Sequence, residues 1–361
     1  MSRPTKAKLD LEALRNNIAH ARTLAPQSKI MAVVKANAYG HGAVVVAQTL
    51  QTLADALAVA CIDEALELRA AGISAPILLL EGIFEREEVH VAAAENFWLC
   101  IDNEWQISVL EQEALQQPVQ TWLKIDTGMH RLGIAPELAG QAYKRLKNNK
   151  NVLHEIVLCT HFASADDLES SQTKEQLDVF NNVCKNLPGP RSAANSPGLL
   201  AWPESHFDWV RPGYMLYGNS PLTLPHDNAE ALQPVMTLSS TIVSMREIGA
   251  GESVGYGATW TAERPSRIAT VTIGYGDGYP RLARNGTPVL VNGQRAGLAG
   301  RVSMDMITID VTHLAQVNVG DEVILWGQGL PLAEVAACAG TIGYELTTRM
   351  PARTKRLVSK A

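Results

Sequence analysis

The sequence predicts an α/β protein in which an N-terminal (β/α)8 barrel of the TIM type, residues 1–231, precedes a mainly β C-terminal domain, residues 232–361. Short apolar runs alternate with helical patterns in the first part, whereas the second part is rich in Val, Ile and Thr between turn signals. A chain of 361 residues has room for two domains, and its 46% hydrophobic and 19% charged residues exclude a disordered protein.

The barrel prediction depends on the order of the apolar runs. Such runs are typical of parallel strands that are buried on both faces. The helical pattern of residues 63–71 has Asp63 as its expected N-cap and Gly72 as its expected C-cap, and another helix is expected after Asn103. Eight strand–helix alternations favour a barrel over its alternative, a doubly wound sheet, although the seventh run is weakly strand-like. The runs are residues 29–35, 56–61, 76–81, 97–102, 121–126, 155–161, 191–195 and 209–217.

The second domain is predicted from a change in amino-acid composition and pattern near residue 232. Residues 235–248 (VMTLSSTIVSMREI) are typical of a long strand, and Asn-Gly dipeptides at 285–286 and 292–293 predict tight turns. One helix is expected near residues 331–339. The proline-rich stretch 221–234 is expected to link the two domains.

Composition and charge restrict the partners. Lys and Arg total 31 against 37 Asp and Glu, a net charge of −6 that argues against nucleic-acid binding but allows a local anion site. No membrane-spanning run is present, and Asp10 and Glu12 interrupt the place where an export signal needs its apolar core. We therefore expect a cytoplasmic protein with no nucleic-acid or membrane partner.

Several common active-site patterns are absent. The five cysteines are widely spaced without any CxxC, and HExxH, GxSxG and Walker-type motifs do not occur. The glycine cluster at 274–279 follows a strand but lacks the GxGxxG pattern that opens a helix. We expect no metal site, no disulfide framework and no dinucleotide site.

The first candidate site residue is Lys35, which ends an apolar run ahead of the glycine-flanked loop 39–42 (YGHG). Active sites of such barrels lie at the carboxyl ends of the strands. A desolvated lysine has a lowered pKa and becomes a nucleophile that can form a Schiff base. The alternative is a lysine whose stem leaves the barrel and whose charge lies in solvent.

Three further patterns are compatible with chemistry but weak when taken alone. Ser196 follows the seventh barrel run and Gly213 follows the start of the eighth, where such barrels often bind phosphate; the alternative is an ordinary turn. Arg131 follows another run and could clamp a carboxylate, or could form an ion pair with a helix. Tyr256, between two glycines, could serve as a base or could cap a hairpin.

Taken together, these segments resemble the alanine racemase family in order and over nearly the whole chain. The resemblance implies a (β/α)8 barrel followed by a β domain, pyridoxal 5′-phosphate (PLP) as cofactor, and isomerase activity on L- and D-alanine. It also implies a homodimer in which each active site is completed by the partner's β domain. The motifs are VVKANAYGHG, PILLLEG, LKIDTGMHRLG, SHFDWVRPG, VGYGATW, GYGDGYPR and GRVSMDMITID.

The resemblance implies two catalytic bases on opposite faces of the substrate. Lys35 resembles the lysine that binds PLP covalently and also acts as one base. Tyr256 of the partner subunit resembles the other base. Arg131 resembles the residue that binds the substrate carboxylate, which is also contacted by the N–H of the partner's Met304.

The resemblance also implies a set of cofactor contacts and three supporting residues. Arg211 would face the pyridine nitrogen, and His161 would bridge Arg211 and the tyrosine base. Lys124 matches a position that can be carbamylated, which would give Arg131 an anionic partner. Supporting positions beside the substrate and at the entryway, both on the partner, are Asp305 and Tyr275. The cofactor contacts, some through the backbone only, are Lys35, Tyr39, His161, Ser196, Arg211, Gly213, Tyr214 and Tyr344.

Two alternatives to an alanine racemase are kept. A broad-specificity amino-acid racemase resembles the same barrel but is typically exported. A non-catalytic PLP-binding protein resembles the barrel alone. The motifs do not separate a role in D-alanine supply for peptidoglycan from a role in alanine catabolism.

Overall fold

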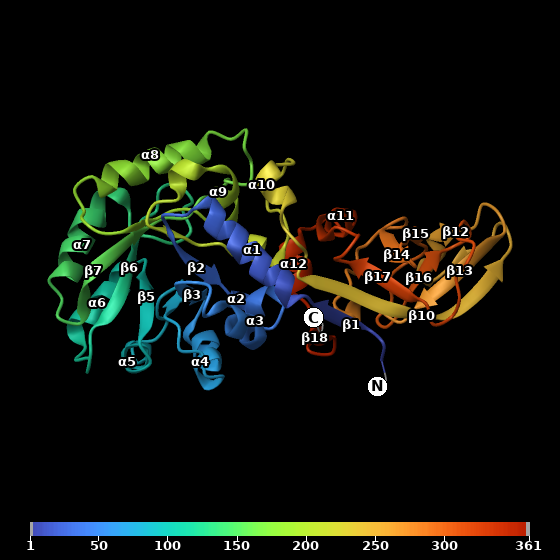
Figure 1. Cartoon of the computed structure of the whole chain (residues 1–361), viewed down its shortest axis with the longest axis horizontal. Helices are drawn as coiled ribbons and strands as arrows, with labels where there is room; N and C mark the ends of the chain where they lie inside the picture. The colour runs from blue at the N-terminus through green and yellow to red at the C-terminus, as the bar shows by residue number, and fades with distance from the viewer. Residues whose placement is uncertain (1–2, 359–361) are drawn as a thin grey trace. The chain divides into compact units, whose positions relative to one another are not determined.

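The computed structural model describes residues 3–358, which form two compact units (Figure 1). The barrel unit comprises Leu14–Ala38 and Gly42–Leu232, and the β unit comprises residues 3–13, Tyr39–His41 and 233–358. Each unit has its own core and is described by itself. None of the helices in the described residues has the length and apolar character that crossing a bilayer requires.

The barrel unit contains a closed barrel of parallel strands, so the predicted fold class is confirmed and the doubly wound alternative is wrong. Each strand pairs with the next along the chain, and β2 pairs with β9 to close the ring. Every apolar run contributes one strand, and the weakest run contributes only two residues. The strands are β2 (Lys29–Val33), β3 (Ala56–Val59), β4 (Ile77–Leu79), β5 (Phe97–Ile101), β6 (Val119–Lys124), β7 (Val152–Cys159), β8 (Arg191–Ser192) and β9 (Trp209–Val210).

Helices separate the strands, and their predicted caps are partly right. Asn103 caps its helix, accepting a hydrogen bond from the N–H of Gln106 at 3.0 Å. Gly72 follows its helix with φ of +82°, as expected, but Asp63 lies inside the first turn because the helix already begins at Ile62. The helices are α1 (Leu11–Leu24), α2 (Lys35–Tyr39), α3 (Ala43–Leu50), α4 (Ile62–Ala70), α5 (Glu88–Ala94), α6 (Glu104–Gln112), α7 (Ala139–Lys147), α8 (Gln172–Cys184), α9 (Ser196–Ala201) and α10 (Asp227–Glu230).

Tryptophans fill part of the barrel interior below the carboxyl ends of the strands. The rings of Trp98, Trp122 and Trp209 lie with centroids 5.5–6.5 Å apart. Side chains two residues apart on a strand share a face, so Cys100 follows Trp98 toward the carboxyl end of β5. Its Sγ lies 4.0 Å from that of Cys159 on β7. Closely packed aromatic rings are rigid, and they support the residues at the carboxyl ends of these strands.

The β unit is built on an eight-stranded sheet in the order β13-β16-β15-β14-β17-β10-β1-β18, with β13 also paired to β10. Asn292 and Gly293 have φ of 51° and 78°, the two positive values that the predicted tight turn between β14 and β15 requires. The strands are β1 (Lys6–Leu9), β10 (Met236–Ile248), β11 (Ser253–Val254), β12 (Trp260–Thr261), β13 (Ser266–Val271), β14 (Pro288–Val291), β15 (Gln294–Leu298), β16 (Ile307–Asp310), β17 (Glu322–Trp326) and β18 (Lys355–Val358).

Two parts of the β unit are not anticipated by the division at residue 231. Strand β1 pairs antiparallel with β10 and parallel with β18, so the start of the chain belongs to the C-terminal sheet. Residues Tyr39–His41 also pack within this unit. The expected late helix is α11 (Leu332–Cys338), and a helix that the sequence reasoning missed, α12 (Gly343–Thr348), follows it.

Candidate active site

Lys35 lies two residues after the end of β2 and opens α2, a turn with an unusual backbone. In the four residues 36–39 every φ lies between 51° and 54°. This left-handed conformation costs an ordinary L-residue roughly 1–2 kcal/mol. Strain of this kind persists only where surrounding contacts hold it, and it is concentrated at functional sites.

Two polar side chains hold this left-handed turn. The carboxylate of Glu64, on α4, accepts hydrogen bonds from the N–H groups of Ala36 at 2.6 Å and Ala60 at 2.8 Å. Oδ1 of Asn37 accepts from the N–H of Ala43 at 2.7 Å. The lysine at the start of the turn is therefore positioned by groups outside its own strand.

The amino group of Lys35 lies among charges of both signs, and its pKa is lowered. Burial is the largest cause, the carboxylate of Glu81 opposes it, and the cations of Arg131 and Lys124 add to the lowering. A lowered pKa leaves more of the amine neutral near physiological pH, and the neutral amine is the nucleophile and the base.

The loop after β6 carries Arg131. Lys124 is the last residue of this strand. Asp126, two residues later, accepts hydrogen bonds at Oδ1 from the backbone N–H groups of residues 128–130 at 3.0–3.1 Å. Burial raises the pKa of Asp126, but these hydrogen bonds outweigh it and hold the pKa below its usual value. The loop is thus fixed by its own carboxylate, while the side chain of Arg131 is exposed and available to a ligand.

Arg211, just after β9, is buried and held by oxygen atoms of the barrel. It donates hydrogen bonds to Oγ of Ser192, to the carbonyl of Thr160 at 2.6 Å and to that of Ala193 at 3.2 Å. Among the described residues its Nε has no partner, so one N–H is left for a ligand. Burial and the charge of Arg211 hold the pKa of His161 well below its usual value, so this imidazole is neutral at physiological pH.

Ser196 and Gly213 are joined by a direct hydrogen bond. Oγ of Ser196, the first residue of α9, accepts hydrogen bonds from the N–H groups of Gly213 at 2.9 Å and Met215 at 3.3 Å. The hydroxyl proton of the serine therefore remains free to donate. Burial raises the pKa of Tyr214, so its phenol is also a donor at neutral pH.

Two further predicted cofactor residues meet within the β unit. The rings of Tyr39 and Tyr344, the latter on α12, lie with centroids 6.1 Å apart. Gly40 has φ of +81°, and a Cβ there would lie 1.8 Å from the carbonyl oxygen of Thr347, so only glycine fits. Burial raises the pKa of Tyr39 to about 12, which keeps its phenol protonated.

Tyr256 lies on a loop of the β unit between β11 and β12. Gly255 and Gly257 on either side have φ of 75° and 73°, and these positive values explain why both positions are glycine. The tyrosine side chain is 72% exposed. Together with Arg301, whose guanidinium lies near Gly257, it lines a cavity of about 420 Å³.

Asn285 joins this loop to the strand segment beside it. Its Nδ2 donates to the carbonyl of Thr259 at 2.8 Å, and its Oδ1 accepts from the N–H of Gly300 at 2.8 Å. The sequence singled out this asparagine only as a turn residue. Its carboxamide links the two segments that carry Tyr256 and Arg301.

Tyr275 and Met304 lie on neighbouring segments of the same unit. The N–H of Tyr275 donates to the carbonyl of Ser303 at 3.0 Å, and that of Gly276 donates to the carbonyl of Met304 at 2.9 Å. A Cβ on Gly274 would lie 2.2 Å from the carbonyl oxygen of Ser303, so this glycine permits the approach. The cluster GYGDGYPR, which lacks the pattern of a dinucleotide site, therefore supports the Met304 segment.

Asp305 is held by an arginine near the end of the chain. Nη2 of Arg353 donates to its Oδ1, and this ion pair lowers the pKa of the Asp305 carboxyl. The same arginine pairs with the fully buried Asp277. Sequence reasoning missed Asp277 and Arg353, and a possible signal for the aspartate was an acidic residue inside a glycine cluster.

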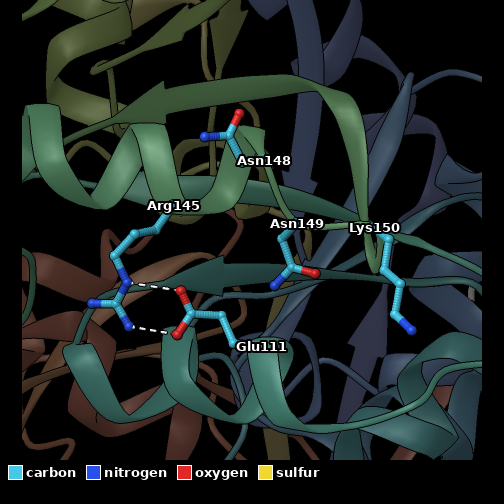
Figure 2. Close-up of a pocket in the computed structure, with 5 residues that line it drawn as sticks. All are labelled: Glu111, Arg145, Asn148, Asn149 and Lys150. Carbon is cyan, nitrogen blue, oxygen red and sulfur yellow. Dashed lines mark hydrogen bonds and ion pairs between the residues drawn. The ribbon is translucent and has the colours of Figure 1, made fainter.

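The pocket in Figure 2, about 460 Å³ in volume, contains none of the predicted site residues. Arg145 faces Glu111 across it and donates two hydrogen bonds of 2.8 Å to that carboxylate (Figure 2). Asn148, Asn149 and Lys150 belong to the loop that leads into β7. This loop lies at the amino end of the barrel strands, the opposite end from Lys35.

Family models and individual relatives match both parts of the chain. The profile of "Alanine racemase, N-terminal domain" matches residues 9–221, and that of "Alanine racemase, C-terminal domain" matches residues 235–358. The alanine racemase of Chromohalobacter salexigens is 51% identical over 356 residues, which cover 99% of this chain and 98% of the relative. The biosynthetic alanine racemase of Escherichia coli K12 is 51% identical over 346 residues, which cover 96% of each chain.

A solved structure shows the same fold. The crystal structure of the biosynthetic alanine racemase from Pseudomonas aeruginosa superimposes with a TM-score of 0.96 at 49% identity. The match covers 99% of this chain and 100% of that one. Both units of the fold therefore occur together in a solved relative.

Proposed function

The chain belongs to the alanine racemase family and interconverts L- and D-alanine, and we propose that it does so with PLP bound to Lys35 and with Tyr256 of the partner subunit as the second base. The names of the relatives support alanine as the substrate over the broad-specificity alternative. Names of the form "biosynthetic alanine racemase" support a role in D-alanine supply.

The residues at the barrel mouth fit an anionic carbonyl cofactor such as PLP. The amine of Lys35 has the lowered pKa that attack on an aldehyde requires. Ser196 has a free hydroxyl proton beside the N–H groups that bind its Oγ, which suits a phosphate. The N–H at Nε of Arg211 suits a ring nitrogen. We propose that Tyr214 donates a further hydrogen bond to the cofactor. Tyr39 and Tyr344, in the β unit, remain proposed cofactor contacts on the family resemblance alone.

The two-base assignment follows from the geometry of racemisation. When bound, PLP supplies an electron-withdrawing ring that delocalises the negative charge left on Cα of the substrate. One base would have to cross the plane of that carbon to complete the reaction. With two groups on opposite faces, the unprotonated one removes the Cα proton from its face and the protonated one delivers its own proton to the other face, so neither has to move. We assign Nζ of Lys35 to one face and the phenol oxygen of the partner's Tyr256 to the other, and the two exchange roles when the opposite enantiomer is the substrate.

Arg131 and Met304 are proposed to orient the substrate. The exposed guanidinium of Arg131 suits two-point binding of a carboxylate. The N–H of Met304 makes no hydrogen bond within residues 3–358, which leaves it available for the same carboxylate. Burial lowers the pKa of Arg211, but a guanidinium is so strong a base that it keeps its proton at neutral pH, and so it donates a hydrogen bond without protonating the ring nitrogen. This disfavours side reactions that need a stronger electron sink.

A homodimer is proposed because the second base and Met304 are on the β unit and are exposed. Tyr256 is 72% and Met304 is 52% exposed in the single chain. Catalysis in water-filled surroundings would weaken each electrostatic contact, so a second copy is expected to cover these residues. We propose that Tyr275 and Asp305 contribute from the same surface.

The observation that carries the proposal is Lys35, a lysine with a lowered pKa at the carboxyl end of a barrel strand. The test is a chiral assay of L- and D-alanine with three proteins. The wild type should racemise in both directions, Lys35→Ala should lose both activity and the visible absorbance of bound PLP, and Tyr256→Phe should lose proton abstraction from one enantiomer far more than from the other. Full activity of Tyr256→Phe in both directions would refute the two-base assignment.

The non-catalytic alternative has its own outcome in this assay. A protein that binds PLP but does not exchange the Cα hydrogen of alanine with solvent deuterium would be a PLP-binding protein. A panel of D-amino acids tests breadth. Turnover of D-serine or D-lysine near that of D-alanine would support the broad-specificity alternative.

A further inference from the structure

We infer that the arginine–aspartate network formed by Arg3, Asp277, Arg353 and Asp305 positions the Met304 amide for the substrate carboxylate. This inference rests on the proposed function, in which the N–H of Met304 binds that carboxylate. The network joins two arginines near the two ends of the chain to two aspartates within the β unit. None of its members was singled out by the sequence except Asp305.

The centre of the network is the carboxylate of Asp277, which is fully buried. Arg3 donates to it with Nε at 3.0 Å and Nη2 at 2.6 Å, and Nε of Arg353 lies 2.8 Å from it. The N–H of Gly274 donates to the same carboxylate at 3.0 Å. A buried carboxylate with this many donors is fixed in place, because loss of any one leaves charge desolvated and uncompensated.

The network extends directly to the C-terminal side of Met304. Nη2 of Arg3 donates to the carbonyl of Asp305 at 2.8 Å, and Arg353 pairs with the Asp305 side chain. The N–H of Gly276, next to Asp277 in sequence, donates to the carbonyl of Met304 at 2.9 Å. The peptide groups on the C-terminal side of Met304 are therefore held while its own N–H points to no partner among the described residues.

Arginine suits this task better than lysine. A guanidinium presents several donors in one plane and contacts two acceptors at once, as Arg3 does with Asp277 and Asp305. Arg353 likewise joins the same two aspartates. Each arginine thus links the buried centre to the Met304 segment, and removal of either one should loosen the segment without touching Lys35 or Tyr256.

The test compares Arg353→Gln with Arg353→Lys and with a matched control, Arg295→Gln. Arg295 also forms a two-point ion pair in the β unit, with Glu334, but has no contact with the network. We would measure kcat and KM for alanine, the visible absorbance of bound PLP, and inhibition by propionate. Propionate has the carboxylate of alanine but no amino group, so its inhibition constant reports on the carboxylate site alone.

Arg353→Gln should raise KM and the propionate inhibition constant together, by roughly tenfold, which is less than the roughly hundredfold that a 1 Å misplacement can cost. The kcat and the PLP absorbance should change little, Arg353→Lys should recover part of the loss, and Arg295→Gln should match the wild type. If Arg353→Gln fails to fold, Arg3→Gln, which leaves the Arg353 pair intact, takes its place.

An unchanged propionate constant in a folded Arg353→Gln or Arg3→Gln protein would overturn the inference. So would a fall in kcat with the constant unchanged, because that pattern indicates a purely structural network. Failure of the proposed function has a different result: the wild type itself would then neither racemise alanine nor be inhibited by propionate.

Discussion

The two units hold their candidate residues in different ways. In the barrel unit, Ser196, Arg211 and Tyr214 are at most 7% exposed, and strand ends and buried hydrogen bonds fix them. In the β unit, Tyr256 and Met304 are 72% and 52% exposed and lie on glycine-containing loops. The candidate residues of the barrel unit, here called the barrel half of the candidate site, are held by contacts within one chain. Those of the β unit, the β half of the candidate site, have side chains exposed to solvent. This difference is what a site shared between two copies would require.

The exposed residues of the β half lie beside a buried ion-pair network that contributes to stability. Asp277→Asn, at the centre of this network, should have the largest effect of the proposed variants. The change leaves Arg3 and Arg353 facing a buried neutral amide. Breaking a fully buried ion pair costs about 3–5 kcal/mol in free energy of unfolding, and this is the upper bound here because the two arginine side chains are 29% and 37% exposed. Chemical denaturation of the wild type and the variant measures the loss. A loss below about 1 kcal/mol would mean that the network is screened like a surface ion pair.

The barrel half has a comparable support in Glu64, and Glu64→Ala should be the next largest change. The variant removes two charge-assisted hydrogen bonds from the backbone, each of which contributes about 1.5–3 kcal/mol, and the left-handed turn after Lys35 would relax. We expect a fall in both stability and racemase activity. Glu67→Ala on the same helix is the matched control. Equal activity in the two variants would show that the turn needs no such support.

Asn285 tests how the exposed loop of the β unit is held. Asn285→Ala removes two neutral hydrogen bonds of about 1 kcal/mol each from the junction beside Tyr256. The expected result is a several-fold loss of proton abstraction from the enantiomer that Tyr256→Phe affects most, with little change for the other. Asn292→Gly, in the second Asn-Gly turn, is the control. An equal loss for both enantiomers would instead indicate a general effect on folding.

The comparison also explains how much could be predicted from the sequence. The barrel strands were predictable because strands buried on both faces leave continuous apolar runs, and even the weak seventh run became the two-residue strand β8. The first strand, β1, was not, because its four residues alternate between half-buried and buried and pair with strands far along the chain. Lys35 could be singled out as a candidate from its place after a strand. The groups that hold it, such as Glu64, act across the fold and leave no local pattern.

The smallest expected effect concerns the neighbouring charges that shift the pKa of Lys35. A lysine exposed to solvent would not feel them to the same extent. Arg131 lowers the pKa of Lys35 and Glu81 raises it, so Arg131→Gln should raise that pKa and Glu81→Gln should lower it. In the proposed function PLP attaches to the neutral amine, so the attachment rate is expected to rise with pH and to level off above the pKa. The plateau should therefore move to higher pH in Arg131→Gln and to lower pH in Glu81→Gln. The measurement is the rate at which protein stripped of PLP regains visible absorbance when PLP is added back. No alanine is present, so the proposed binding of alanine by Arg131 does not affect the measured rate. Arg145→Gln, at the other end of the barrel, is the control, and shifts in the same direction for both variants would contradict the assigned charges.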